Sequence, residues 1–269
     1  MPDEHRRDDR HQDPDDPSGE GQEISTEELT STEWLARVLA CVGGYVDAVG
    51  YVALFRLFTA HQSGNSAGLG VALGSGDWTS AWRRGLAIGA YILGVAAGTA
   101  LVEIGRRANL RSTGTAVAAA QVAVLAAAVG IGVAASGSAR IPPADTAPYV
   151  AIASCLAVAM GFQAVTLRRV GSRTVRTTFV TGVLTNFAET AVVAWIRPKG
   201  GRGASIGSFS ALLGSIWVLY LGGAVAGAVA QLDWAFYSLL VPIAVVIAVG
   251  LWELSMGFQP SLPVKGLTE

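Results

Sequence analysis

Charged residues are scarce over most of this chain. They make up only 14% of its 269 residues, whereas a soluble domain usually carries about 25%. This composition excludes a large soluble domain, because too little charge remains to cover its surface. The two cysteines, Cys41 and Cys155, lie in apolar segments without the spacing of a zinc or redox motif. Of the three histidines, only His61 lies outside the N-terminal tail.

Catalytic motifs are also missing. No cluster of histidine, cysteine and carboxylate has metal-ligand spacing, and no G-x-S-x-G follows a predicted strand. The loop at 197–203 (RPKGGRG) lacks the GK[ST] ending of a P-loop. An intramembrane hydrolase would need a Ser/His or double-Asp pair within the spans, and only Asp47 lies deep. We therefore expect no enzyme, no cofactor and no metal site.

Long apolar runs are abundant. Hydrophobic residues make up 51% of the chain, and several runs reach the ~20 residues that a helix needs to cross the hydrocarbon core. We predict an all-α, polytopic membrane protein in the lipid bilayer of the bacterial inner membrane. The expected segments are Trp34–Leu57, His61–Gly76, Arg83–Ile104, Thr115–Ser136, Ala147–Leu167, Thr177–Ile196, Gly207–Ala230 and Trp234–Leu254.

The first 33 residues differ in charge from the rest. They hold twelve acidic residues and three arginines, whereas residues 34–269 hold eight acidic and sixteen basic residues. Because this acidic tail has almost no apolar side chains, we predict that it is disordered. The transmembrane domain is expected at 34–254, with Ser31 or Thr32 capping its first helix, and a C-terminal tail at 255–269.

Two halves of the transmembrane domain resemble each other. Gly85, Tyr91, Gly94 and Gly98 recur 129 positions later as Gly214, Tyr220, Gly223 and Gly227. We predict an internal repeat with halves at about 34–136 and 147–254. The glycine pairs are GxxxG-type contacts, which pack helices inside one chain or between the chains of a homo-oligomer.

Basic residues bear on the number of spans, because cytoplasmic loops are enriched in lysine and arginine. If all eight segments cross, the sixteen bases of the body divide equally between the two sides. If 61–76 and 177–196 enter and leave on the same side, six helices cross and twelve bases face the cytoplasm. We predict six spans with both termini cytoplasmic; eight spans are the alternative. Arginine clusters at 106–111 and 168–176 then act as topology signals and need no nucleic-acid partner.

Asp47 lies inside an otherwise apolar segment, Gly44–Asn65. An ionised carboxylate in the middle of a span costs several kcal/mol unless it is paired or hydrated. Two interpretations are open. Asp47 is either a coupling or substrate-facing group, such as a proton carrier, or a hydrogen-bonded carboxyl that locks helices together. Glu189 has the same status, although it lies nearer to a segment end.

Small polar residues mark the starts of both short segments. Ser63-Gly64-Asn65 and Thr181-Gly182 predict tight turns, because glycine permits them and the neighbouring hydroxyl and amide groups satisfy freed backbone groups. A helix that begins inside the membrane directs its unpaired N–H groups at the midplane, as in transporters with discontinuous helices. Close helix packing is the alternative. The candidate substrate or coupling residues are Asp47, His61, Gln62, Ser63, Gly64, Asn65, Gln163, Thr181, Gly182, Thr185, Asn186 and Glu189.

At these motifs the chain resembles the YoaK family of uncharacterised bacterial integral membrane proteins. The resemblance covers roughly 34–254 and rests on four ordered motifs. They are Gly44-Tyr45-Val46-Asp47-Ala48, Ser63-Gly64-Asn65, Met160-Gly161-Phe162-Gln163-Ala164-Val165 and Thr181-Gly182-Val183-Leu184-Thr185, with Arg168 and Arg169 before the last. The family has an asparagine where this chain has Ala164, so Asp47 has no polar twin. The resemblance implies a permease-like role without a substrate.

Taken together, these features favour a small-solute permease with its site where the two glycine-containing segments meet. A non-transporting scaffold or regulator, acting through the acidic tail and the helix-packing faces, is the second hypothesis.

Overall fold

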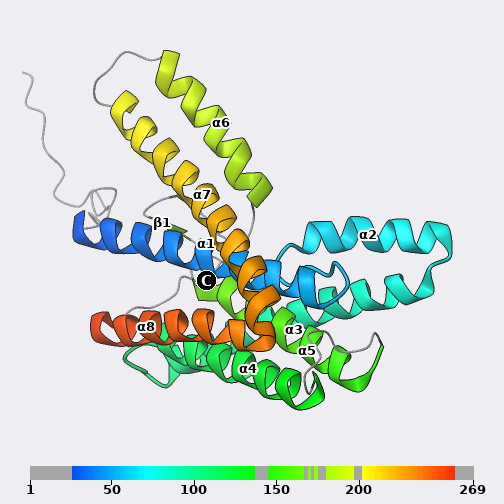
Figure 1. The fold of residues 1–269 in the computed structure, drawn as a ribbon. Helices are drawn as coiled ribbons and strands as arrows, with labels where there is room; N and C mark the ends of the chain where they lie inside the picture. Colours follow the sequence, from blue (N-terminus) through cyan, green and yellow to red (C-terminus); the bar gives the residue numbers. More distant parts are fainter. Residues whose placement is uncertain are drawn as a thin grey trace, which may run out of the picture.

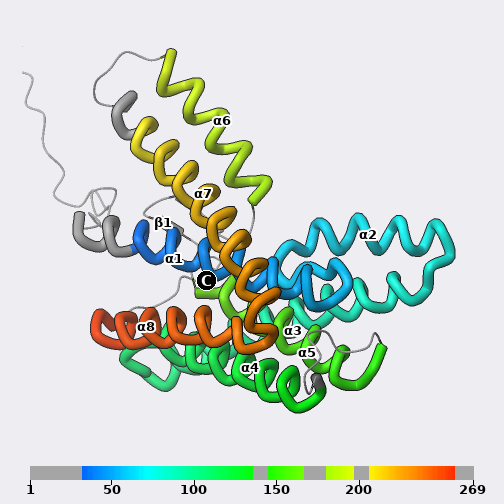
Figure 2. The backbone as a smooth tube through the Cα atoms, in the orientation of Figure 1, coloured from blue at the N-terminus to red at the C-terminus, as the bar shows by residue number. Residues whose placement is uncertain are grey.

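A computed structural model describes residues 26–136, 145–166, 169–170, 173–174, 180–196 and 202–257. Each predicted apolar segment is a helix in this structure (Figures 1 and 2). The helices are α1 (Thr26–Ala53), α2 (Gln62–Ser75), α3 (Trp78–Arg107), α4 (Thr113–Ser136), α5 (Ala147–Thr166), α6 (Val180–Ile196), α7 (Arg202–Trp234), the 3₁₀ helix η2 (Ala235–Leu239) and α8 (Leu240–Met256). One short antiparallel ladder departs from an all-α fold: β1 (Arg169–Val170) pairs with β2 (Arg173–Thr174).

Five stretches of the described chain are long and apolar enough to cross a membrane. They are Thr32–Ala53, Trp78–Arg107, Thr113–Ala135, Ala147–Thr166 and Ile206–Met256. The last is 51 residues long and contains α7 and α8. Helix α6 is apolar but shorter. Helix α2 has only 14 residues, a length of about 21 Å at 1.5 Å per residue, which is less than the ~30 Å hydrocarbon core.

The start of the first helix differs from the prediction. Helix α1 begins at Thr26, so the expected cap at Ser31 or Thr32 is wrong. Glu27 and Glu28 follow the helix start in the sequence, and acidic residues suit the positive end of the helix dipole. Helical structure therefore extends eight residues into what we expected to be a disordered tail of 33 residues. Residues 1–25 lie outside the described residues.

Two helix pairs, α1 with α7 and α3 with α5, pack through glycine. A methyl group on Gly223 of α7 would overlap the Cys41 carbonyl of α1, and one on Gly227 would overlap the Tyr45 carbonyl. Because contacts advance along both helices together, α1 and α7 run in the same direction. The glycine faces thus pack inside the chain, which is the first of the two alternatives above.

The pair of α3 and α5 has the same construction. A methyl group on Gly94 of α3 would overlap the Val158 carbonyl of α5, and the next glycine, Gly98, lies against the Phe162 ring. A glycine of α5 makes the same kind of contact with α3, because a methyl group on Gly161 would meet the Tyr91 carbonyl. Helices α3 and α5 therefore also run parallel to each other.

Contacts along α1 give the directions of the remaining helices. Gln163 of α5 reaches the Leu39 carbonyl and Tyr149 reaches the Leu54 carbonyl, so α5 is antiparallel to α1. Trp34 packs edge-on against Trp252 of α8, whereas the Tyr45 hydroxyl donates to Ser238 in η2.

Helix α8 is therefore also antiparallel to α1. Because α7 runs parallel to α1, the 51-residue stretch reverses direction at η2, where Ala235 has a φ of 50°.

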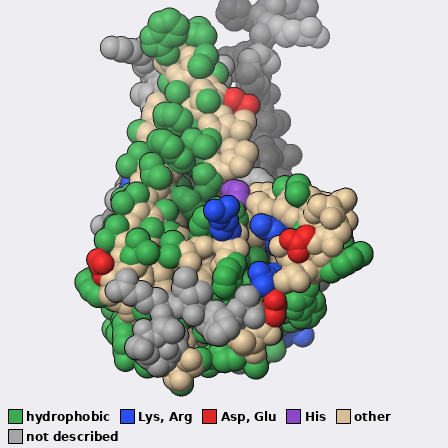
Figure 3. Space-filling model, turned by 45° about the vertical axis from the view of Figure 1, so that its right-hand side comes forward, with side chains coloured by type: hydrophobic (Ala, Val, Ile, Leu, Met, Phe, Trp, Pro, Cys, Tyr) green, Lys and Arg blue, Asp and Glu red, His purple; other side chains and the backbone are tan. Residues whose placement is uncertain are grey.

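Two helical hairpins, α2–α3 and α6–α7, extend from a central body (Figure 1). Helix α2 contacts α3 and helix α6 contacts α7, and these are their only helix contacts in the described chain. Their outer faces are apolar: Val71 is 72% exposed and Trp195 is 86% exposed. Figure 3 shows hydrophobic side chains over much of one face, with several charged side chains gathered in one region and single charged side chains elsewhere. Such surfaces suit contact with lipid.

The glycines of α7 provide a direct test of this packing. Gly223→Ala must push α1 away from α7, because its methyl group would overlap the Cys41 backbone. We expect the variant to lose about 1–3 kcal/mol of unfolding free energy, the usual cost of overpacking. The adjacent Gly222 has no atom within 4 Å of a built methyl group, so Gly222→Ala is the matched control and should unfold like the wild type. Chemical unfolding of the two purified proteins in detergent measures the difference; equal stabilities would contradict the packing.

Candidate functional site

The centre of the candidate site is the loop between α1 and α2, residues 54–61. Phe55 and Arg56 have φ values of 55° and 63°, in the left-handed region. The Arg56 N–H closes the end of α1 by donating to the Tyr51 carbonyl. Two consecutive left-handed residues stop the helix and turn the chain back towards α1. The loop therefore lies beside the carboxylate of Asp47.

Asp47 is 2% exposed and accepts four hydrogen bonds. Its Oδ1 accepts from the backbone N–H groups of Thr59 at 2.7 Å and Ala60 at 2.6 Å, and from the Thr59 hydroxyl at 3.1 Å. Its Oδ2 accepts from the hydroxyl of Tyr220 in α7 at 2.7 Å. Both carboxylate oxygens therefore have hydrogen-bond donors, so neither is a buried acceptor without a partner.

Asp47 therefore joins three parts of the chain: α1, the loop before α2, and α7. Two of its donors are backbone groups that would otherwise be buried without partners. Gly50, one turn further along α1, leaves room for this loop, because a methyl there would meet Cγ2 of Thr59 at 2.5 Å. The hydrogen bonds connect these parts as the locking interpretation expects, and they join residues of the two predicted halves.

Asn65 holds the same loop from the other side. Its amide nitrogen donates to the Phe58 carbonyl at 2.7 Å, and its carbonyl oxygen accepts from the Phe58 N–H at 3.2 Å. The amide also donates to Gln62 Oε1, and Gln62 Nε2 donates to the Thr59 carbonyl. The side chain of Asn65 thus pairs with both backbone polar groups of Phe58, and its oxygen and its nitrogen both form hydrogen bonds.

The prediction of a tight turn at Ser63-Gly64-Asn65 is wrong. These residues form the first turn of helix α2, and Thr181-Gly182 lie in the first turn of α6. Gly64 is needed for close approach rather than for a turn, because a methyl there would lie 3.1 Å from the Phe58 ring. The chain turns earlier, in the loop that Asp47 and Asn65 hold. The expectation that helices begin at these motifs is confirmed for both segments.

His61 lies at the entrance to α2. Its Nε2 is 3.2 Å from the Ser63 hydroxyl, and its ring packs edge-on against Phe58 at 5.4 Å between centroids. Both side chains are partly exposed.

Gln163 lies in a second buried polar group next to Asp47. Its Nε2 donates to the Leu39 carbonyl of α1 at 2.8 Å, and its Oε1 accepts from Gln121 of α4 at 3.0 Å. Gly43 lies between the Gln121–Gln163 pair and Tyr220, the partner of Asp47. A methyl group on Gly43 would lie 3.4 Å from Gln163 Nε2 and 4.0 Å from the Tyr220 ring. Two groups of buried polar side chains, Gln121 with Gln163 and Asp47 with Tyr220, therefore lie on either side of Gly43, and we call them together the row of polar side chains.

The residues predicted in the second segment lie apart from this group. Thr181, Thr185, Asn186 and Glu189 are on α6, whose helix contacts are with α7 alone in the described chain, and α2 and α6 do not touch. The Thr185 hydroxyl donates back to the Thr181 carbonyl within α6. The structure thus brings together Asp47, Gln62, Asn65 and Gln163, but not the two glycine-containing segments.

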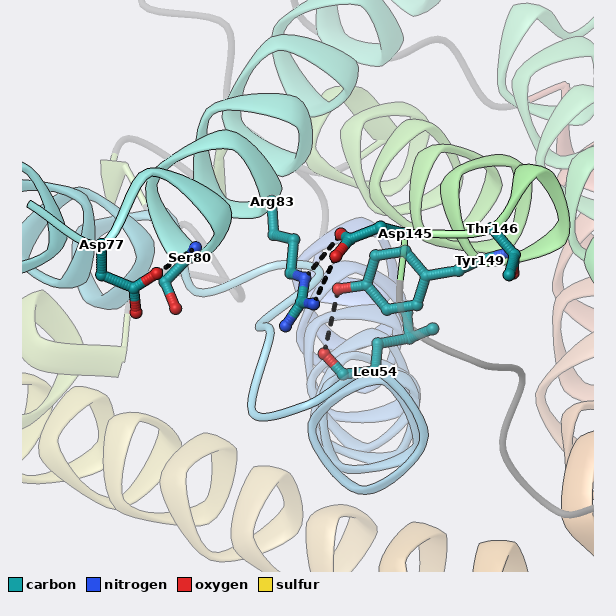
Figure 4. A network of polar contacts seen from close by, with 7 residues as sticks. All are labelled: Leu54, Asp77, Ser80, Arg83, Asp145, Thr146 and Tyr149. Carbon is teal, nitrogen blue, oxygen red and sulfur yellow. Dashed lines mark hydrogen bonds and ion pairs between the residues drawn. The ribbon is translucent and has the colours of Figure 1, made fainter.

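An ion pair and a hydrogen bond connect α3 and α5 to the end of α1 (Figure 4). Arg83 of α3 donates to both oxygens of Asp145 at 2.8 and 2.7 Å, and its guanidinium lies over the rings of Phe55 and Tyr149. Tyr149 in turn donates to the Leu54 carbonyl at 3.3 Å. The Arg83 side chain lowers the pKa of Asp145 below its ordinary value, chiefly by hydrogen bonding. These contacts fix the end of α1, and with it the start of the loop.

Glu253 is a buried acidic residue that the sequence reasoning missed. It is 0% exposed, and both carboxylate oxygens have no hydrogen-bond partner in the described chain. In the sequence it is one residue from the predicted end of the last span, where an acid is usually an interfacial group. Only the packing of α8 against α4 reveals its burial.

Two apolar grooves line the outside of the bundle. One, of about 420 Å³, lies between α1, α7 and α8, and the other, of about 620 Å³, lies between α2, α3 and α5. Neither is lined by Asp47. Among the described residues, no group of three histidine, cysteine or acidic side chains is placed to hold a metal ion.

Comparison with known proteins places this arrangement in a family. Residues 35–252 match the model of a family described as protein of unknown function (DUF1275). A relative from Bacillus subtilis (strain 168), the UPF0700 transmembrane protein YoaK, is 23% identical over 215 residues, which cover 80% of this chain and 91% of the relative. No solved structure matches the chain.

The hydrogen bond across the two halves is tested by Tyr220→Phe, which removes only the hydroxyl that donates to Asp47. Hydrogen bonds to charged groups contribute about 1.5–3 kcal/mol, and we expect a loss of unfolding free energy in that range. Tyr237→Phe is the matched control, because Tyr237 is 56% exposed and its hydroxyl makes no hydrogen bond within the described part. Unfolding in detergent reports both variants; a Tyr220→Phe protein as stable as Tyr237→Phe would contradict the bridging role.

Proposed function

Because the chain belongs to the DUF1275 family of unknown function and is an integral membrane protein, we propose that it is a small-solute permease. Its site is the row of polar side chains beside the α1–α2 loop, with Asp47 as the coupling carboxylate. The proposal involves no enzymatic step, and the identity of the solute is left to experiment. One observation supports it most: α1 with α7 and α3 with α5 make the same kind of glycine contact, each pair joins one predicted half to the other, and Asp47 is bonded to Tyr220 within the first pair.

An internal repeat is supported by contacts that recur at fixed offsets. Gly44 lies against the Tyr220 carbonyl and Gly161 against the Tyr91 carbonyl. Gly44 and Gly161 are 117 positions apart, and Tyr91 and Tyr220 are 129 apart. Each half thus contributes its first helix to the long helix of the other half.

The contact of Gly223 with Cys41 recurs in the same way as that of Gly94 with Val158. Cys41 and Val158 are again 117 apart, and Gly94 and Gly223 are 129 apart. If the two glycine-rich helices were similar by chance, we would not expect the residues that contact them to recur at a fixed offset as well.

Helix directions support six spans with an inverted repeat. Taking α1 as forward, α7 is forward, and α5 and α8 are backward. Helix α3 runs parallel to α5 and is therefore backward. Helix α4 is antiparallel to α8, because Gly114 meets Glu253 and Gly132 meets Phe236, so α4 is forward.

The six other α-helices of the described chain therefore alternate in direction when α2 and α6 are left out. The first half reads forward, backward, forward, and the second half reads the reverse. Transporters built from inverted repeats place a substrate site where the halves meet, at interrupted helices. In this chain the corresponding place is the α1–α2 break, where the Asp47 carboxylate binds the loop.

Asp47 suits a coupling role because its four hydrogen bonds join parts that must separate if the halves rock against each other. Tyr220 belongs to the second half, and Thr59 and Ala60 belong to the first. A cation or solute group that competes for the carboxylate would release the loop or α7. Binding would then shift the population between two arrangements of the halves.

The scaffold hypothesis assigns the function to the acidic tail and the helix-packing faces instead of to a solute site. Both GxxxG-type faces are occupied inside the chain, so a scaffold would depend on the acidic tail. Removal of residues 1–25 leaves α1 intact and separates the hypotheses. A permease retains its flux without the tail, whereas a tail-dependent scaffold loses its partner.

A metabolite uptake and export screen tests the permease. A deletion strain is complemented with the wild type, Asp47→Asn, or Asp233→Asn as an exposed carboxylate control. We expect one solute whose flux depends on the protein and falls about tenfold or more in Asp47→Asn, which corresponds to ~1.4 kcal/mol. Asp233→Asn should match the wild type. If no solute differs between the deletion and wild-type strains, the permease proposal is wrong.

A further inference from the structure

Glu253 of α8 ends in a slot at the start of α4. A methyl group on Gly114 would lie 2.9 Å from the carboxyl carbon and from Oε2 of Glu253, and 3.0 Å from Oε1. Gly114 is the second residue of α4, so the carboxyl occupies the space that any other side chain would fill. Protein atoms cover the Glu253 side chain completely, because it is 0% exposed.

Contacts on either side hold the two helices together at this slot. The Thr115 hydroxyl donates to the Gly250 carbonyl at 3.0 Å, one turn from Glu253. Gly250 lies close to α4, because a methyl group on it would be 3.1 Å from the Cβ atom of Ala118. The first turn of α4 has its own cap, since the Thr115 N–H donates to the Ser112 hydroxyl. The Glu253 carboxyl is thus held by shape and not by hydrogen bonds.

Charged groups near the slot are directed elsewhere. The Arg111 guanidinium, which precedes α4, donates to the Ser255 carbonyl at 3.4 Å. On α1, the residues nearest this end of α8 are Glu33 and Arg37, which pair with each other at 3.3 Å. Helix η2 offers only Tyr237, at the opposite end of α8. Neither oxygen of Glu253 accepts a hydrogen bond from the described residues.

An ionised carboxylate in such a place is strongly disfavoured, because burial removes its hydration and nothing replaces it. A metal ion would need several further oxygen ligands, and no group of three metal-ligating side chains exists in the described chain. A proton needs no other ligand. It converts the carboxylate into a neutral acid that an apolar slot accommodates.

We propose that Glu253 is a proton-binding residue, which holds a proton while α4 and α8 are closed on the slot and exchanges it when they separate. The proton is bound on a carboxyl oxygen and leaves to water without any change in covalent bonds. If the protein is a permease, this exchange couples solute movement to protons. That coupling rests on the proposed function, whereas proton binding by Glu253 does not.

Asp47 and Glu253 then have different tasks. Asp47 accepts four hydrogen bonds, with donors on both oxygens. Glu253 accepts none, and its buried slot suits a neutral acid. A proton carrier needs a group whose charged form the closed state rejects, and among the described residues Glu253 has such surroundings.

Infrared difference spectroscopy of the purified protein near neutral pH tests proton binding directly. A protonated carboxyl has a C=O stretching band that an ionised carboxylate lacks. We expect this band in the wild type, its loss in Glu253→Gln, and its retention in Glu103→Gln, where the replaced acid is partly exposed and paired with Arg107 at 2.8 Å. A wild-type spectrum without a protonated-acid band, or a band unchanged in Glu253→Gln, would overturn the proposal.

A second pair of variants tests the slot without touching the acid. Gly114→Ala displaces the Glu253 carboxyl, so the acid band should shift or disappear. Gly130→Ala on the same helix, where a built methyl meets no atom within 4 Å, should leave the band unchanged. Equal spectra from the two variants would contradict the slot.

Reconstituted vesicles separate this inference from the permease proposal. With the solute found by the screen, we expect a proton gradient to drive uptake by the wild type but not by Glu253→Gln, which should still exchange solute down its own gradient. Gradient-driven uptake by Glu253→Gln would refute coupling at Glu253. If no solute is moved at all, the permease fails, and the infrared result still decides whether Glu253 binds a proton.

Discussion

The hydrogen bonds of Asp47 are the constraint on which the arrangement of this bundle depends. One carboxylate stabilises a break between α1 and α2 by accepting from two backbone N–H groups, and it also holds α7 through Tyr220. Without an acceptor there, the N–H groups of Thr59 and Ala60 would be buried unpaired, which the low dielectric of a membrane makes costly. The loop would have to move or hydrate, and α7 would lose its contact with the loop.

Around this interaction the long helices pair across the halves of the chain. Helix α1 lies on α7 and α5 lies on α3, in each case through glycines that let backbones touch. Packing of this kind depends on shape, because lipid tails compete for apolar side chains as well as protein does. Under the permease proposal the two predicted halves would move against each other, and the hairpins α2–α3 and α6–α7 would move with them. Glu253, in its slot between α4 and α8, would then be the residue that holds and releases the proton.

Much of the fold could be predicted from the sequence. Length and hydropathy located the eight α-helices of the described chain, though not the short helix η2, since a span in hydrocarbon needs about 20 apolar residues. The glycine offsets identified the surfaces that pack. What failed were local conformations that side chains decide. Ser63-Gly64-Asn65 has the composition of a turn, yet the turn lies at Phe55 and Arg56, whose left-handed φ values have no compositional signal.

The candidate site was predicted in part for the same reason. Asp47, Asn65 and Gln163 were found because a polar group in an apolar segment needs a partner, although the partners themselves could not be named. Tyr220 was noticed only as a member of a repeat, and its bond to Asp47 spans 173 positions. Glu253 was missed because its burial arises from the approach of α4, 139 positions away at Gly114.

The central claim is that α1 and α3 cross the membrane whereas α2 enters and leaves on one side. Single cysteines at Arg56, Ser75 and Ala108, in a background where Cys41 and Cys155 are replaced by alanine, test it most directly. All three positions are exposed at helix ends or loops. With an impermeant thiol reagent on intact cells, we expect positions 56 and 75 to be labelled together and position 108 to be protected. Labelling of 56 together with 108, and protection of 75, would show that α2 crosses and would contradict the inverted repeat.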